Sequence, residues 1–220
     1  EWLEEIKNVA IKTNEEWAKK LGINQSTAIT AVKPSGTVSQ LVDSASGIHP
    51  RFSKYYVRRV RSDKKDPLAV FMEQSGFPVE QDVTSPSNSI FSFPVKAPKE
   101  SVTVKQVGAM QQLELWKAYQ NHWCEHKPSI TVYYTDDEFL QVAQWIWDNF
   151  DICSGISLLP VSDHIYQQAP YEDITVDKYK ELVAAMPKGV DWKDLEQFEQ
   201  EDNTTGSQEL ACVGGACEIV

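Results

Sequence analysis

A short segment near the start of the chain has residues of the kinds that bind phosphate. Residues 28–32 are rich in β-branched side chains and favour a strand, a Pro-Ser-Gly turn follows, and a helix is expected to open just after it. The start of a helix leaves backbone N–H groups without intrahelical partners and carries the positive end of the helix dipole. Small residues let an anion approach those donors, and hydroxyl groups add more, so the pattern indicates a phosphate site. An ordinary strand-to-helix connection has the same local pattern and stays the alternative. The candidate residues are Pro34, Ser35, Gly36, Thr37, Val38 and Ser39.

Two cysteines near the end of the chain, Cys212 and Cys217, are a second candidate for chemistry. They flank Val-Gly-Gly-Ala in a polar, glycine-containing segment, residues 199–220, which we expect to be mobile. Such a pair can close a small disulfide ring, and thiol–disulfide exchange by a flexible arm is one interpretation. Zinc binding would need further ligands, and no histidine or additional cysteine lies nearby in the sequence. Cys124 and Cys153 are scattered and are interpreted as small buried residues.

Three arginines, Arg58, Arg59 and Arg61, end an extended aromatic segment that begins near Phe52. They are the main basic concentration in an acidic chain. One interpretation is a solvated strand end with internal salt bridges. The other is attraction of a polyphosphate, which needs positive potential close to its site. The sequence leaves both open.

The four histidines do not form a convincing metal site. His122 and His126 are four residues apart, which is the spacing of a zinc-binding helix, but the HExxH arrangement is missing. They also fall where the helix should end, before Pro128. We therefore expect no metal site at these histidines.

Composition limits the class of protein. The 220 residues carry a formal net charge of −11, which disfavours free nucleic acid as a partner. Hydrophobic residues make up 41% and charged residues 24%, values typical of a globular protein with a real core. We see neither an apolar run long enough for a membrane span nor a signal peptide, and the cysteine usage favours a reducing cytoplasm. The first residue is Glu1 rather than Met, so we expect a processed start or a longer polypeptide.

Strands and helices alternate between residues 27 and 159, the pattern of an α/β fold with about four strands, buried on both faces in a parallel sheet. This is too few strands to close a barrel of eight or more. We expect an N-cap at Thr135 or Asp136 for the helix near residues 136–150. The expected helices cover residues 1–21, 38–42, 66–76, 104–124, 136–150 and 177–186, with a short one near 192–198, and the expected strands or extended segments cover residues 28–32, 52–61, 89–95, 128–134 and 155–160.

Several stretches together resemble the C-terminal part of adenosylcobalamin-dependent (class II) ribonucleotide reductases, especially the monomeric ribonucleoside-triphosphate reductase type. The resemblance covers nearly the whole chain, and its most specific parts are the turn and the tail. The matching stretches are Lys33-Pro34-Ser35-Gly36-Thr37-Val38-Ser39, residues 47–61 (GIHPRFSKYYVRRVR), residues 123–129 (WCEHKPS), Ser154-Gly155-Ile156-Ser157 and residues 201–217.

This resemblance implies a fold, a reaction and roles for residues. Residues 1–198 would supply the later strands of a ten-stranded α/β barrel, and residues 199–220 would be a flexible redox tail. The turn at residues 34–39 would bind the phosphates of a ribonucleoside triphosphate. Cys212 and Cys217 would reduce the active-site disulfide and be re-reduced by thioredoxin. The family uses adenosylcobalamin to generate a thiyl radical and replaces the ribose 2′-hydroxyl with hydrogen.

One departure from the family pattern is important. The radical cysteine and its reducing pair lie upstream of the turn in this family, whereas this chain has no cysteine before Cys124. We therefore expect the chain alone to be inactive and to need the missing N-terminal part, which should hold most of the cobalamin site. The alternatives are a diphosphate reductase of the same class and a non-enzymatic phosphate-binding α/β module with a metal-binding tail.

Overall fold

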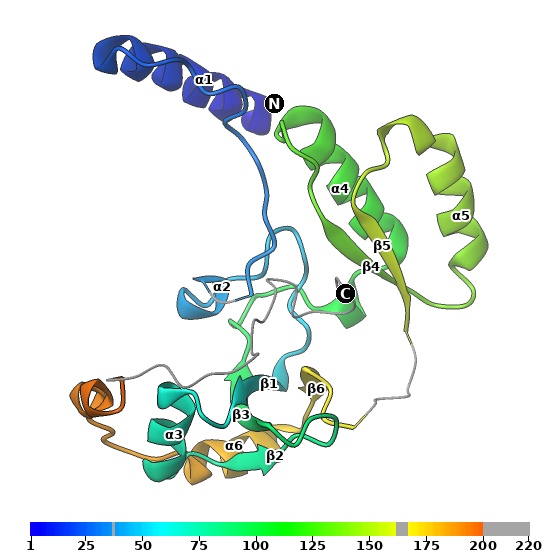
Figure 1. Cartoon of the computed structure of the whole chain (residues 1–220). Helices are drawn as coiled ribbons and strands as arrows, with labels where there is room; N and C mark the ends of the chain where they lie inside the picture. The colour runs from blue at the N-terminus through cyan, green and yellow to red at the C-terminus, as the bar shows by residue number, and fades with distance from the viewer. Residues whose placement is uncertain (37, 162–166, 200–220) are drawn as a thin grey trace. The chain divides into compact units, whose positions relative to one another are not determined.

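The computed structural model describes residues 1–36, 38–161 and 167–199 and has a mixed α/β fold (Figure 1). The chain divides into two compact units. Unit 1 comprises residues 1–51 and 100–162, and unit 2 comprises residues 52–99 and 163–220. Thr37 and the cysteine pair Cys212 and Cys217 lie outside the described residues. No helix in the described ranges is both long enough and apolar enough to cross a membrane.

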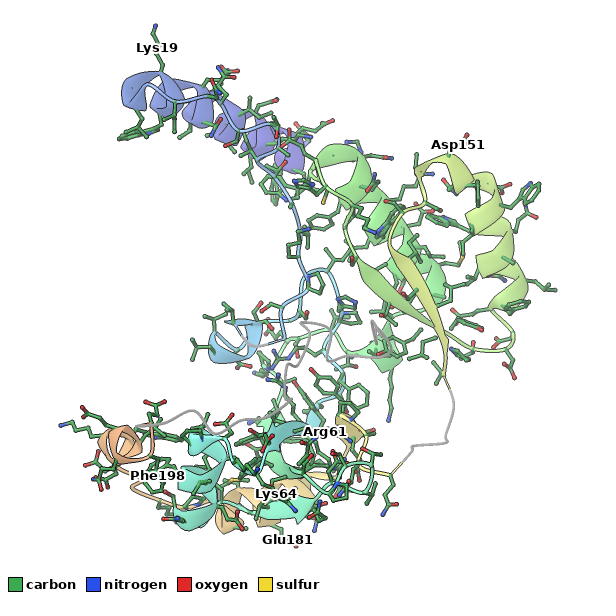
Figure 2. All side chains as sticks on the ribbon, viewed as in Figure 1. Lys19, Arg61, Lys64, Asp151, Glu181 and Phe198 are labelled. Carbon is green, nitrogen blue, oxygen red and sulfur yellow. The ribbon has the colours of Figure 1, made fainter. Side chains whose placement is uncertain are left out.

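Unit 1 begins with the predicted amphipathic helix, α1 (Trp2–Leu21). Glutamates in its first turn and lysines in its last turn complement the helix dipole, and Lys19 projects outward from the helix (Figure 2). The helix ends at Gly22, whose φ of 68° is left-handed, as expected for a C-cap glycine. Ala18 is its one buried residue in the described structure, and Trp2 is 81% exposed.

The core of unit 1 lies on a parallel pair of strands, β4 (Ile130–Tyr134) and β5 (Ile156–Pro160). The helices α4 (Ala109–His122) and α5 (Phe139–Asp148) supply the other side chains of this core. The 3₁₀ turn η1 (Val104–Gln106) precedes α4, and η2 (Phe150–Ile152) follows α5. The most deeply buried core residues are Ala109, Leu113, Trp116, Val132 and Val142, each 0% exposed.

Three predictions in unit 1 need correction. Residues 28–32 are not a strand: the backbone N–H groups of Ile29 and Thr30 donate to the Glu125 carboxylate instead of to a neighbouring strand. The helix predicted over residues 104–124 is split, because Gly108 separates η1 from α4. The N-cap of α5 is Glu138 rather than Thr135 or Asp136, and the Glu138 carboxylate accepts hydrogen bonds from Thr135.

Unit 2 contains a four-stranded sheet in the order β2-β3-β1-β6. Every neighbouring pair is antiparallel, so the prediction of a uniformly parallel sheet is wrong for this unit. The physical reason is that β2 and β3 are joined by a short hairpin, which only antiparallel strands allow. The elements of this unit are β1 (Tyr55–Asp63), α3 (Pro67–Gln74), β2 (Val79–Gln81), β3 (Asn88–Lys96), β6 (Tyr171–Asp173), α6 (Val176–Ala185) and the 3₁₀ segment η3 (Trp192–Gln197).

A second core, separate from the first, holds unit 2 together. Phe71 and Met72 of α3 are buried with Phe91 of β3. Phe71 also makes ring contacts with Trp192, at 5.5 Å between centroids, and with Phe198. Trp192 and Phe198 therefore pack against α3. They lie in or next to η3, where a short helix was expected.

Candidate functional site

The six candidate residues at positions 34–39 are called the phosphate turn from here on, and the last two of them begin the short helix α2 (Val38–Leu41). Within this turn the Ser39 N–H donates to Ser35 Oγ over 3.0 Å, and Ser39 Oγ donates to the Ser35 carbonyl over 2.6 Å. Ser39 is 6% exposed. These serines therefore build the turn itself, rather than pointing both hydroxyls outward as ligand donors. Pro34 and Gly36 are exposed, and among the described residues, its chain neighbours aside, no heavy atom lies within 4 Å of a Cβ placed on Gly36.

The loop after α2 folds back onto the phosphate turn. The Ser35 N–H donates to Ser46 Oγ over 2.7 Å. Gly47 has a φ of 57°, and a Cβ placed on it would lie 3.3 Å from Val32 Cγ1 and 3.4 Å from the Lys33 carbonyl oxygen. Only glycine adopts this conformation without strain at such a close approach. The sequence motif around Gly47 thus belongs to the site, although its local pattern contains no signal for that role.

His49 connects this loop to the sheet of unit 1. Its Nδ1 lies 2.7 Å from the Ser46 carbonyl oxygen, and its Nε2 lies 2.9 Å from the backbone nitrogen of Thr131 in β4. Neither ring nitrogen is therefore available to a metal in this arrangement. Ile48, beside it, is 8% exposed and belongs to the unit 1 core.

Arg51 fixes the other end of the same loop. Its guanidinium donates to the Ser44 carbonyl over 2.5 Å and to Asp43 Oδ1 over 2.6 Å. The Arg51 side chain is 5% exposed, whereas that of Asp43 is 63% exposed. Arg51 therefore holds residues 43–44, which follow α2, through its guanidinium group.

Glu125 anchors the segment that leads into the phosphate turn. Its Oε2 accepts from the N–H groups of Ile29, over 2.7 Å, and Thr30, over 2.8 Å. These two hydrogen bonds lower the pKa of the Glu125 carboxyl, and the bond from the Thr30 N–H has the larger effect. Thr30 Oγ1 also donates to the Trp123 carbonyl over 2.5 Å. Trp123 and Glu125 therefore hold residues 29–31 in place, since Trp123 Nε1 also donates to the Ala31 carbonyl.

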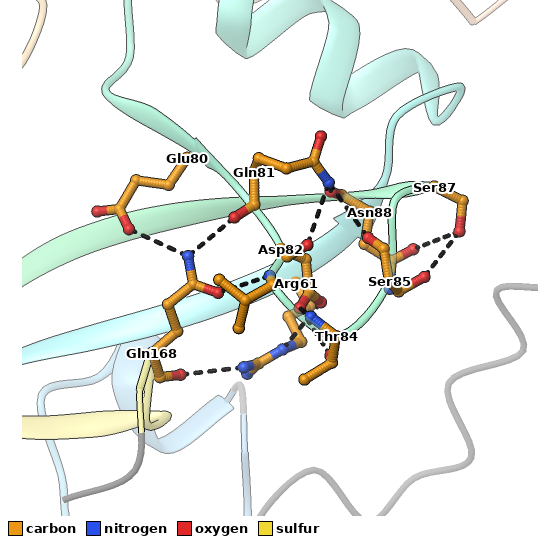
Figure 3. Close-up of polar contacts among 10 residues, drawn as sticks. Arg61, Glu80, Gln81, Asp82, Thr84, Ser85, Ser87, Asn88 and Gln168 are labelled. Atoms are coloured by element: carbon orange, nitrogen blue, oxygen red, sulfur yellow. Dashed lines mark hydrogen bonds and ion pairs between the residues drawn. The ribbon is translucent and has the colours of Figure 1, made fainter.

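Two of the three arginines predicted as a possible polyphosphate site are paired inside unit 2. Arg59 forms an ion pair with Glu172 and donates to the Ala169 carbonyl. Arg61 donates to Asp82 Oδ2 over 3.2 Å and to the Gln168 carbonyl over 3.0 Å (Figure 3). These contacts favour the internal salt-bridge interpretation of Arg59 and Arg61.

Asp82 is the buried acid of this network, with a side chain that is 1% exposed. Burial alone would raise the pKa of Asp82, but hydrogen bonds from Thr84 and the charge of Arg61 outweigh it and hold the pKa below its usual range. Gln168 ties the same network to β2, because its amide nitrogen donates to the Gln81 carbonyl over 2.9 Å and its Oε1 accepts from the Val83 N–H.

The remaining candidates offer little chemistry. Cys124 and Cys153 are half-buried free thiols, and burial raises the pKa of both, which disfavours the nucleophilic thiolate. Within the described ranges, no three His, Cys, Asp or Glu side chains are grouped so as to hold a metal ion. His122 instead lies 3.0 Å from Glu4 Oε1.

Two of the three comparisons with known proteins point to the same kind of enzyme. No family model matches the chain. An adenosylcobalamin-dependent ribonucleoside-triphosphate reductase of Lactobacillus delbrueckii subsp. bulgaricus is 29% identical over 230 residues, which cover 99% of this chain and 30% of that protein. The enzyme of the same description from Levilactobacillus brevis is 30% identical, over 95% of this chain and 29% of the relative. A probable enzyme of this kind from Dictyostelium discoideum is 29% identical over 94% of this chain.

A solved structure gives the same result for the fold. The crystal structure of a B12-dependent (class II) ribonucleotide reductase matches with a TM-score of 0.73 and 26% identity, over 90% of this chain and 27% of that chain. The chain thus spans about 30% of the length of the curated relatives it matches. By sequence and by fold, it is related to the C-terminal part of adenosylcobalamin-dependent (class II) ribonucleotide reductases.

Proposed function

We propose that the chain is the C-terminal part of a ribonucleotide reductase that converts ribonucleoside triphosphates to 2′-deoxyribonucleoside triphosphates in the cytoplasm. The observation that carries this proposal is similarity along nearly the whole chain, at 29% identity over 99% of it, to enzymes named for that activity. The names of these relatives favour a triphosphate over a diphosphate substrate. In the net reaction two thiols become a disulfide, the ribose 2′-hydroxyl leaves as water, and hydrogen takes its place.

The cofactor of the relatives would generate the thiyl radical that starts this reaction. The chain spans about 30% of the length of these relatives, which is consistent with a cobalamin site that lies mostly elsewhere in the reductase. We place the cofactor site in the part of the reductase that lies outside this chain. The contribution of this chain is then to hold the substrate and to deliver electrons.

The phosphate turn would hold the substrate through its backbone. Helix α2 starts within it, and no described residue beyond the chain neighbours of Gly36 would meet a Cβ placed there, so a phosphate could approach the main chain from that side. Titration of the purified chain with ATP, followed by backbone amide NMR, tests this role. Shifts centred on residues 34–39 would support it, and binding without shifts in this turn would contradict it.

The tail pair, Cys212 and Cys217, would deliver the electrons. As a dithiol it would reduce the active-site disulfide by thiol–disulfide exchange, becoming a disulfide itself, and the dithiol of thioredoxin would then reduce it. In the complete reductase, Cys212→Ser or Cys217→Ser should abolish turnover with thioredoxin but not with dithiothreitol. Full activity of both variants with thioredoxin would contradict the proposal.

The sheet of unit 1 supports the need for the rest of the reductase. Three outward-facing backbone groups of β4 are taken by side chains: the Thr131 N–H donates to His49, and the Gln112 amide contacts both the N–H and the carbonyl of Tyr133 at 3.4 and 3.3 Å. On its other side β4 pairs with β5, which has no second neighbour among the described strands. Leu158 and Leu159 of β5 are 38% and 46% exposed.

We therefore propose that the remaining part of the reductase adds its strand beside β5. Mixing the chain with the N-terminal part of a relative should restore nucleotide reduction that depends on adenosylcobalamin, while either part alone should be inactive. Leu159→Asp should weaken this complementation, and Lys19→Asp, on the exposed end of α1, serves as the matched surface control. Activity of the chain alone would overturn the proposal.

A further inference from the structure

A continuous set of hydrogen bonds runs from the sheet of unit 1 to the phosphate turn. The Thr131 N–H of β4 donates to His49 Nε2 over 2.9 Å, and His49 Nδ1 donates to the Ser46 carbonyl over 2.7 Å. Ser46 Oγ accepts from the Ser35 N–H over 2.7 Å, and Ser35 Oγ accepts from the Ser39 N–H over 3.0 Å. The histidine is the one side chain in this set that contacts β4.

The partners of His49 fix its tautomer. The Ser46 carbonyl oxygen can only accept, so Nδ1 carries the ring proton. The Thr131 N–H can only donate, so Nε2 is unprotonated and acts as the acceptor. An imidazole has this donor and acceptor on opposite sides of a rigid ring. The amide of asparagine or glutamine carries its donor and its acceptor on the same carbon atom. It can therefore replace one of the two contacts of His49, but it cannot make both at once.

The position of His49 makes these contacts a mechanical link. Thr131 lies between Ile130 and Val132, which are 2% and 0% exposed in the unit 1 core, so the β4 end of the link is rigid. Ile48, next to His49, is packed in the same core. Gly47 has a left-handed φ and lies close against Lys33, the residue before the phosphate turn. Movement of the loop at residues 46–49 would therefore move the turn.

We propose that His49 is a positioning residue, which fixes the loop at residues 46–49 on β4 and thereby sets the place of the phosphate turn relative to the sheet. It acts through Ser46 and Ser35 and does not itself touch the substrate. This inference rests on the proposed phosphate-binding role of the turn. It adds a residue that determines how well that turn is held ready for a nucleotide.

The test uses the purified full chain with ATP as the probe. His49→Ala should weaken ATP binding about tenfold, the effect expected when a pair of hydrogen bonds that organises a site is lost. His49→Asn should keep the donor to Ser46, and His49→Gln should keep the acceptor for Thr131, so each should show a smaller loss than His49→Ala. His122→Ala is the matched control. His122 ends α4, its side chain is 47% exposed, and it contacts Glu4 of α1. This variant should bind ATP like the wild type.

Two NMR measurements keep the role of His49 separate from the role of the turn. Ring ¹⁵N spectra of the folded chain at neutral pH should show a protonated Nδ1 and an unprotonated Nε2 for His49, and the opposite tautomer would overturn the proposal. The backbone amide resonances of Ser35 and Ser39 should shift in His49→Gln and His49→Asn even without nucleotide. Unshifted resonances would overturn the positioning role, as would wild-type ATP affinity in both variants.

The possible failures are distinguishable. A wild-type chain that binds no ATP would count against the proposed phosphate site, whereas the tautomer and the Ser35 and Ser39 resonances would still decide whether His49 positions the turn. If His49→Ala does not fold by circular dichroism, the Asn and Gln variants carry the test. A double substitution with Ser46→Ala adds a check: if both residues act on one turn, it should lose less affinity than the product of the two single losses.

Discussion

The two sheets of the molecule satisfy their backbone and charged groups in different ways. The sheet of unit 2 has four antiparallel strands, and its buried Asp82 and half-buried arginines find partners inside the same unit. The sheet of unit 1 has two parallel strands, one edge covered by side chains and one edge without a described partner. Parallel strands pair through long crossovers and are normally covered on both faces. The difference supports the proposal that unit 1 supplies one part of a larger sheet, whereas the charged groups of unit 2 are paired within that unit.

The largest expected effect concerns the core of unit 1. Trp116 is fully buried, and its Nε1 donates to the Pro128 carbonyl over 2.8 Å. Trp116→Ala should destabilise the chain by about 3–5 kcal/mol in urea denaturation. Amide exchange should accelerate in β4 but stay unchanged in β1 if the units are independent. Trp147→Ala is the matched control, because Trp147 is 79% exposed, and it should change stability by less than about 0.5 kcal/mol. Equal acceleration in both strands would contradict the comparison.

The next effect concerns the self-contained pairing in unit 2. Asp82→Ala leaves the Arg61 guanidinium, which is 20% exposed, without its carboxylate. Because that side chain keeps some contact with water, we expect a loss of about 2–3 kcal/mol, somewhat below the cost of breaking a fully buried pair. Asp177→Ala breaks the exposed 3.5 Å contact with Lys180 and removes a carboxylate from the first turn of α6, and it should cost less than about 1 kcal/mol. If the two variants are equally stable, the network in Figure 3 contributes little to unit 2.

The same carboxylate gives unit 2 an acid sensitivity. The pKa of Asp82 is lower in the folded chain than in the unfolded chain, so its stabilising contribution is present above the unfolded pKa. It should be lost as the pH falls below about 4, the ordinary value for aspartate, toward the lowered folded pKa. Urea denaturation between pH 6 and pH 3 should therefore show a steeper loss for the wild type than for Asp82→Asn. Parallel curves would contradict this assignment.

A smaller effect is expected at two glycines of unit 1. Gly47→Ala places a Cβ at a φ of 57° and against Val32, which should cost about 1–2 kcal/mol. Gly36→Ala places a Cβ in open space and should leave stability within about 0.5 kcal/mol. If the phosphate turn binds nucleotide, Gly36→Ala should nevertheless weaken ATP binding. Unchanged binding in a stable Gly36→Ala chain would argue against the approach of phosphate at this position.

The smallest effect concerns the Glu125 clamp on the segment before the turn. Glu125→Ala removes the acceptor of the Ile29 and Thr30 N–H groups, so hydrogen exchange at these two amides should accelerate about tenfold. Amides of β3 in unit 2 serve as an internal reference and should exchange at the wild-type rate. Slow exchange at Thr30 in the variant would show that the segment is held by contacts other than this carboxylate.

The predictable part of the fold was the local part. Helix α1 follows from its apolar spacing and from Gly22, and β3 follows from the alternation around Phe91. Whether strands pair in parallel or antiparallel was not predictable. Alternation of apolar and polar residues shows which face of a strand is buried, but not which strand lies beside it. The strand expected at residues 28–32 is missing for the same reason: a strand exists only where another strand pairs with it.

At the candidate site, the start of helix α2 was predictable, but the contacts that surround it were not. The spacing of Ser35 and Ser39 marks a helix start, but the contact between His49 and Thr131 joins residues 82 positions apart. Likewise, the sequence gives three clustered arginines without their distant partners, Glu172 for Arg59 and Gln168 for Arg61. Contacts between residues so far apart in the sequence form only when the chain folds, and they leave no periodic pattern in the sequence.

The covered edge of β4 has a consequence for how copies of the chain can meet. An exposed strand edge is a template for further strands, and a growing fibre needs such an edge on both sides of every sheet. In the sheet of unit 1, Gln112 and His49 occupy the backbone groups on the β4 side. Two copies could therefore join β5 to β5, but that joined sheet would have covered edges at both ends. Growth through this sheet would stop at two chains, so His49, besides its proposed role in positioning the phosphate turn, would together with Gln112 limit aggregation through this sheet.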